Sequence, residues 1–103
     1  MAGILDKIKR ITKEMGAYLV SYNAESIQVE EKLKEEIRKT GKWANIMPST
    51  WIVVTHETIP EVRTRFNMAT EGKCPLFLVD VTGQVWGTYD VTEEVTNWMK
   101  TNV

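Results

Sequence analysis

The sequence predicts an α+β protein, and three observations indicate it. Strand-like and helix-like segments alternate between residues 17 and 81 in the order strand, helix, strand, strand, helix, strand. The predicted strands are rich in β-branched and aromatic residues. Glycines at 16, 41 and 72 each follow a helical pattern, so we expect left-handed residues just past three helix ends. A βαββαβ order within about 65 residues is the ferredoxin-like pattern, an antiparallel four-stranded sheet with two helices on one face.

Residues 1–16 are predicted to form an amphipathic N-terminal helix that precedes a ferredoxin-like domain of residues 17–103. Its apolar stripe consists of Ile4, Leu5, Ile8, Ile11 and Met15. Its basic residues are Lys7, Lys9, Arg10 and Lys13. We expect this helix to pack on the sheet or on a partner subunit.

The domain begins with a predicted strand over 17–22 and a helix over about 26–40. Two further strands follow, over 43–47 and 50–55, with a tight turn between them at Met47-Pro48-Ser49. The second of these is the strongest strand pattern in the chain.

The third helix is predicted to start at a capping box, Thr58 with Glu61. A strand over 75–81 follows it, and an extended piece around Val85-Trp86 is expected to add an edge. Asp90 is predicted to cap a C-terminal helix. The residues of that helix expected to point inward are Val91, Val95 and Trp98.

The predicted strands are apolar on both faces, which is unusual for a sheet that helices cover on one side only. In the strand over 50–55, Trp51 and Val53 alternate with Ile52 and Val54. The second face therefore needs its own cover, either a partner subunit or an added helix.

Composition narrows the class of protein. The 103 residues include 13 Lys plus Arg and 14 Asp plus Glu, a balance that argues against a dedicated nucleic-acid binder. The one cysteine, Cys74, excludes an internal disulfide and is expected to be a small buried hydrophobe. No apolar run approaches the roughly 20 residues that span a bilayer, so we expect a cytoplasmic protein without a membrane partner.

Several segments together resemble a known family. They are Tyr18-Leu19-Val20-Ser21-Tyr22, Gly41-Lys42-Trp43, Ser49-Thr50-Trp51-Ile52-Val53, the run from Leu76 to Gly83, and Trp98. Over residues 17 to about 101 the chain resembles the short bacterial and phage proteins called SinR-like, which are similar to the CRISPR-associated adaptation protein Cas-two. The resemblance implies a ferredoxin-like homodimer.

The chain departs from this family at Asn23, where the family commonly has an aspartate that is the proposed metal ligand in Cas-two proteins. An asparagine brings no charge, so it is a poor sole ligand for a hard cation. We therefore expect a non-catalytic binding protein without metal or cofactor. Its ligand would be a protein, a nucleic acid or a nucleotide, and the resemblance suits a phage or accessory role in host interaction.

The alternative is a nuclease that uses Mg²⁺ or Mn²⁺ on RNA or DNA and binds the metal through Asp80 or another carboxylate, with Asp80 expected close to Asn23. His56, the only histidine, has a suitable ordinary pKa for acid–base catalysis but no sequence neighbour that completes a site.

The expected binding residues are Tyr22, Asn23, Ser49 and Thr50. Asn23 also suits a cap or turn, and Ser49 and Thr50 equally suit a hairpin turn. Trp43, Trp51 and Trp86 can stack bases, but core packing is the more common use of Trp.

Overall fold

The computed structural model describes residues 15–103, which form an α+β fold. This part of the chain contains a four-stranded antiparallel sheet and three helices. The strands are β1 (Gly16–Tyr22), β2 (Lys42–Met47), β3 (Thr50–Thr55) and β4 (Leu76–Asp80). The helices are α2 (Ile27–Thr40), α3 (Ile59–Ala69) and α4 (Glu93–Asn102). Except for Met15 and Gly16, the predicted N-terminal helix lies outside the described residues.

The strand order across the sheet is β2-β3-β1-β4. The central strand β1 pairs antiparallel with β3 on one side and with β4 on the other. In this register Leu19 lies opposite both Ile52 and Val79. The edge strand β2 pairs with β3, and the two are joined by the predicted turn, in which Ser49 has a φ of 64°.

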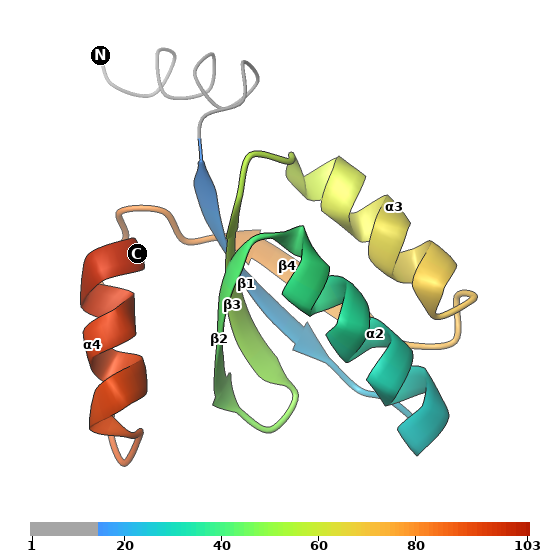
Figure 1. The fold of residues 1–103 in the computed structure, drawn as a ribbon, viewed down its shortest axis with the longest axis horizontal. Helices are drawn as coiled ribbons and strands as arrows, with labels where there is room; N and C mark the ends of the chain where they lie inside the picture. The colour runs from blue at the N-terminus through green and yellow to red at the C-terminus, as the bar shows by residue number, and fades with distance from the viewer. Residues whose placement is uncertain (1–14) are drawn as a thin grey trace.

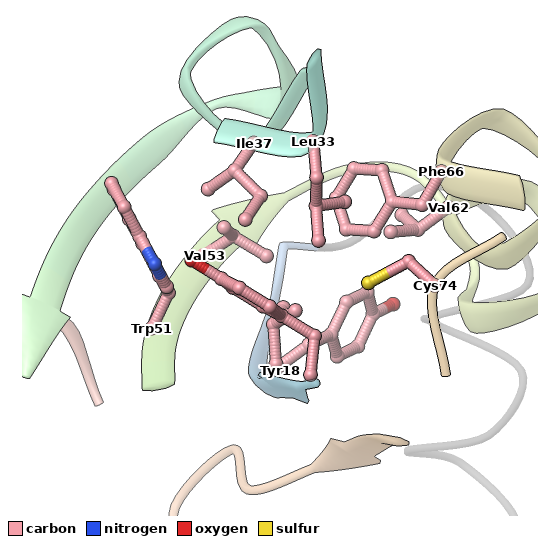
Figure 2. Packing of buried hydrophobic residues seen from close by; sticks show 10 residues of the cluster. Tyr18, Leu33, Ile37, Trp51, Val53, Val62, Phe66 and Cys74 are labelled. Atoms are coloured by element: carbon pink, nitrogen blue, oxygen red, sulfur yellow. The ribbon is translucent and has the colours of Figure 1, made fainter. Parts of the chain in front are cut away.

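Helices α2 and α3 lie side by side on one face of the sheet (Figure 1). Figure 2 shows the core that this packing creates, where Leu33 and Ile37 of α2 and Phe66 of α3 meet the strand residues and each is 0% exposed. The α3 capping box is confirmed, because Thr58 and Glu61 exchange side-chain and backbone hydrogen bonds. Fixed helix starts of this kind set which residues face the sheet.

Helix α4 lies on the opposite face (Figure 1). The cluster buried between α4 and the sheet consists of Ala17, Ile52 and Val54 of the strands and Met99 of α4, with Val95 and Trp98 packed against it. The prediction that the second face needs a cover is thus met, over part of the sheet, by a helix of the chain itself.

Four local predictions are wrong. Thr92, and not Asp90, is the N-cap of α4, since its side chain accepts a hydrogen bond from the Val95 backbone N–H at 3.3 Å. Residues 85–86 form no strand. Gly16 begins β1 and does not end a helix in the left-handed conformation.

The fourth wrong prediction concerns Gly41, which has a φ of 166° and so is extended. A glycine is required there for another reason, because a Cβ would collide with the backbone carbonyl oxygen of Val54. Gly72 is left-handed as predicted, with a φ of 70°.

None of the helices in the described range 15–103 is long and apolar enough to cross a bilayer.

Candidate functional site

Three of the four predicted binding residues meet where β1 ends. The Tyr22 backbone N–H donates to the Ser49 carbonyl oxygen at 3.1 Å, and the Asn23 N–H donates to the Pro75 carbonyl oxygen at 3.1 Å. Thr50 is close as well, since it pairs with Ser21 in the sheet. A shallow hollow of about 270 Å³ lies here, lined by Ser21, Tyr22, Asn23, Pro75, Leu76 and Phe77.

Tyr22 is a packing residue at this end of the sheet. It is 6% exposed and belongs to the core under α2 and α3. Its hydroxyl donates to Oε2 of Glu30 at 2.9 Å. Burial, with the neighbouring Glu30 carboxylate as a smaller cause, raises the pKa of Tyr22 to about 12. The phenol therefore stays protonated at neutral pH.

Asn23 has an exposed side chain, which forms no hydrogen bond with another described residue. It does not cap α2, because that cap is Ser26, whose Oγ accepts from the Val29 N–H at 3.1 Å. Its backbone extends the β1–β4 ladder by one residue. The Asn23 amide is thus available to a ligand at the hollow.

Asp80 does not lie close to Asn23, which corrects the geometry that the nuclease alternative assumed. Asp80 pairs with Tyr18, whereas Asn23 meets Pro75 five positions away along β4. At roughly 3.3 Å per residue the separation is about 17 Å. The sheet order also makes β4 an edge strand and not a central one. Within one subunit, this distance excludes a metal shared by these two residues.

The Asp80 carboxylate has a structural use instead. Its Oδ1 accepts hydrogen bonds from the backbone N–H of Thr82 at 3.0 Å and from the Thr82 hydroxyl at 2.7 Å. The same hydroxyl oxygen accepts from the Ala17 N–H at 2.8 Å. These bonds tie the segment after β4 to the start of β1.

His56 is exposed and follows the last residue of β3. Since Thr55 pairs with Gly16, His56 belongs to the end of the sheet opposite Asn23. The structure therefore separates Asn23 from His56 as well as from Asp80. Within residues 15–103, no group of three or more His, Cys, Asp or Glu is placed to hold a metal ion.

Cys74 is 6% exposed, as expected for a small buried hydrophobe. Burial raises the pKa of its thiol, which keeps the sulfur protonated and weakly nucleophilic. Trp51 is buried as well, at 2% exposure, which is the core placement that the sequence favoured.

One polar cluster was missed at the sequence level. Arg65 of α3 donates to both carboxylate oxygens of Glu57, at 2.6 and 3.1 Å, and to Oε2 of Glu36 at 3.1 Å. It also donates to the Thr40 hydroxyl at 2.7 Å. These contacts join α3 to α2. No spacing rule finds them, because the partners lie up to 29 positions apart.

A mainly apolar surface adjoins the Asn23 hollow. It consists of two facing pairs on β1 and β4, Leu19 with Val79 and Ser21 with Phe77, and we name it the β1–β4 strip. Leu76 and Leu78 pack into the core under α2 and α3, so the alternate residues Phe77 and Val79 point to the opposite face. Phe77 is 62% exposed and Val79 is 36% exposed.

A comparison of the sequence with protein-family models found no match, and a comparison with curated proteins found no significant match. The resemblance of residues 17–101 to the SinR-like and Cas-two proteins therefore stays a hypothesis.

Proposed function

We propose that this protein is a small, non-enzymatic binding protein with a ferredoxin-like, Cas-two-like fold, and that it acts as a cytoplasmic homodimer. The strand order β2-β3-β1-β4, with α2 and α3 on one face, supports the ferredoxin-like assignment. In that fold the two edge strands are the second and the fourth, and the first and third are central.

The observation that carries the proposal is the β1–β4 strip. Phe77 places a large aromatic ring on an edge strand with 62% of its surface exposed, beside Val79 and half-buried Leu19. Contiguous apolar surface of this kind marks interaction sites in soluble proteins. A second copy is a fitting occupant, because a twofold axis brings the same strip of both subunits together.

A protein occupant, here the second copy, is favoured over a nucleic acid for this surface. The strip itself carries no charged side chain, and the whole chain has a formal net charge of −1. Nucleic-acid affinity comes largely from cations that neutralise phosphates. The Asn23 hollow adjoins the strip, so in the dimer Asn23 would lie at the rim of the interface. A phage or accessory role in host interaction rests on the resemblance alone.

Light scattering of the full chain at micromolar concentration tests the dimer. We expect twice the monomer mass of 11.8 kDa for the wild type and the monomer mass for Phe77→Asp. Ile27→Asp is the matched control, because Ile27 is 75% exposed at the first turn of α2, where a carboxylate suits the helix dipole. A monomeric wild type, or a Phe77→Asp protein that still dimerises, would refute the proposal.

A further inference from the structure

The outer edge of β4 presents backbone groups that the sheet does not use. Pro75 and Val81, which flank β4, each form a backbone hydrogen bond to β1 or to the residue just after it. Hydrogen-bonded positions alternate along an antiparallel strand, so Phe77 also bonds to β1. The N–H and C=O groups of Leu76 and Leu78 therefore point away from β1, toward an edge with which no strand in the described part of the chain pairs.

The two edges of the sheet differ in how well they are protected against a further strand. The edge strand β2 carries Lys42 and has a register shift between Asn45 and Met47. Charged side chains and bulges of this kind hinder pairing with another chain. From Leu76 to Val79, β4 pairs regularly with β1 and has no charged residue or proline. Thus β4 is the edge that can accept a further strand.

A groove of about 480 Å³ lies beside this edge, on the side of the sheet that α3 covers. Its lining comes from α3 and from the start of β4, and consists of Arg63, Thr64, Asn67, Met68, Cys74 and Leu76. Arg63 is exposed and forms no ion pair with any residue between 15 and 103. The lining contains no acidic residue. The only charge of the groove is therefore a cation, and a carboxylate is its complement.

We propose that the β4 edge binds an extended segment of a partner protein, which joins the sheet as a further strand and places an acidic side chain in the groove. The backbone of the segment bonds to the outward N–H and C=O groups of Leu76 and Leu78. Directly paired residues of neighbouring strands share a face, so a residue of the segment opposite Leu76 points to the α3 side. A glutamate at that position meets Arg63.

This segment and the second copy of the chain use different surfaces. The groove lies on the α3 side of β4, whereas the β1–β4 strip lies on the opposite face. The Phe77→Asp protein, which we expect to be monomeric, should therefore still bind the segment. Failure of the homodimer and failure of strand addition are thus observed separately, the first by light scattering and the second by peptide binding.

The test uses the full chain and a capped heptapeptide of threonines around a central glutamate, because Thr favours strands. Amide hydrogen exchange is followed by NMR, with the Phe77 amide as an internal reference. We expect the peptide to slow exchange of the Leu76 and Leu78 amides. Unchanged exchange at the highest soluble peptide concentration would overturn the proposal. Protection of both amides before peptide is added would also overturn it, since this chain or a second copy would then already occupy the edge.

Two N-methylated peptides test whether the contact is a strand pairing. One carries the methyl group on the central glutamate, and the other carries it on the next threonine. The N–H groups of successive strand residues point in opposite directions, so one methyl group blocks a bond to β4 while the other faces solvent. We expect one of the two peptides to lose the protection of Leu76 and Leu78 and the other to keep it. Equal behaviour of both peptides would contradict strand addition.

A pair of matched variants tests the acidic side chain. Arg63→Gln should weaken binding of the glutamate peptide about three- to fivefold, which is the range for one exposed ion pair, and should leave a peptide with glutamine in its place unaffected. Lys32→Gln removes the same charge from an exposed position on α2 that does not line the groove, so its effect should stay below about twofold. Equal effects of the two variants would show attraction to general charge, and would overturn the proposal.

Discussion

The face of the sheet under α2 and α3 and the face under α4 carry similar apolar strand residues, but they are buried to different depths. Under α2 and α3, Val20 and Val53 are 0% exposed. Under α4, Val54 is 7% exposed, and further across the same face Phe77 is 62% exposed. Within residues 15–103, the first face is covered by two helices of 14 and 11 residues, whereas the second is covered by one helix of 10. The apolar pattern of a strand therefore predicts that a face is covered, whereas the number of helices on that face determines how much of it is buried.

The largest loss of stability is expected for a substitution in the core under α2 and α3. Trp51→Ala should lower the free energy of unfolding by about 3–5 kcal/mol in a urea titration, because it removes a large, fully packed ring. Its Nε1–H meets no acceptor at hydrogen-bonding geometry within the described part of the chain, although the indole lies close enough to the Tyr22 hydroxyl to act on the pKa of that group. Trp51→Phe, which keeps a ring in the core, should therefore cost much less than Trp51→Ala, and equal losses would show that the contact of the indole N–H with Tyr22 is a full hydrogen bond.

A smaller loss is expected under α4. Met99→Ala should cost about 2 kcal/mol, near the lower end for buried methionine, because partly exposed neighbours can relax into the space. Thermal melts of Trp51→Ala and Met99→Ala at one protein concentration would show which face contributes more to stability. A loss at Met99 as large as the loss at Trp51 would mean that the second face is closed as tightly as the first.

The same substitution on the two faces gives the sharpest contrast. Val53→Thr puts a hydroxyl into the core under α2 and α3 and should cost about 1–3 kcal/mol. Val79→Thr changes a side chain that is 36% exposed and should stay within about 0.5 kcal/mol when measured at high dilution. A large cost for Val79→Thr at every protein concentration would show that a segment of the same subunit covers the β1–β4 strip.

The smallest loss of stability is expected at Tyr22, at the edge of the core under α2 and α3. Tyr22→Phe removes the hydrogen bond to Glu30 and should cost about 0.5–1.5 kcal/mol at neutral pH. Folding raises the Tyr22 pKa from 10.0 to about 12, so the folded state holds this proton more tightly than the unfolded state. That contribution to stability is complete below pH 10 and is lost as the pH rises to about 12. Urea titrations from pH 8 to 11.5 should therefore show the advantage of the wild type over Tyr22→Phe shrinking above pH 10 until it disappears or reverses, and a constant difference would contradict the raised pKa.

Most secondary-structure elements could be predicted, because each has a local cause. Helix α3 carries a capping box at Thr58, and β3 has an uninterrupted run of strand-forming residues. The wrong predictions arose where a local sequence rule was compatible with more than one structure. Asp90 and Thr92 are both good N-caps, and Thr92 is the one used. Gly41 fits a helix end by pattern, yet the close approach of the β3 backbone at Val54 is what requires it.

The candidate site was predicted in part for the same reason. Tyr22, Asn23 and Ser49 meet because a strand end and a neighbouring hairpin turn are joined by one ladder. Asp80 was misplaced because its position relative to Asn23 depends on the direction and register of β4 against β1, which neither segment encodes alone.

The sequence by itself determined the α+β class, the order of the elements within residues 17–81 and the need to cover both faces of the sheet, since these follow from periodicity and local hydrogen bonding. Only the tertiary structure decided that α4 covers the β2 side, that Phe77 stays exposed on β4, and that Asn23 and Asp80 lie at opposite ends. Those outcomes depend on which distant segments pair and pack. That choice is made by the burial of apolar surface across the whole chain, and no short window of sequence contains it.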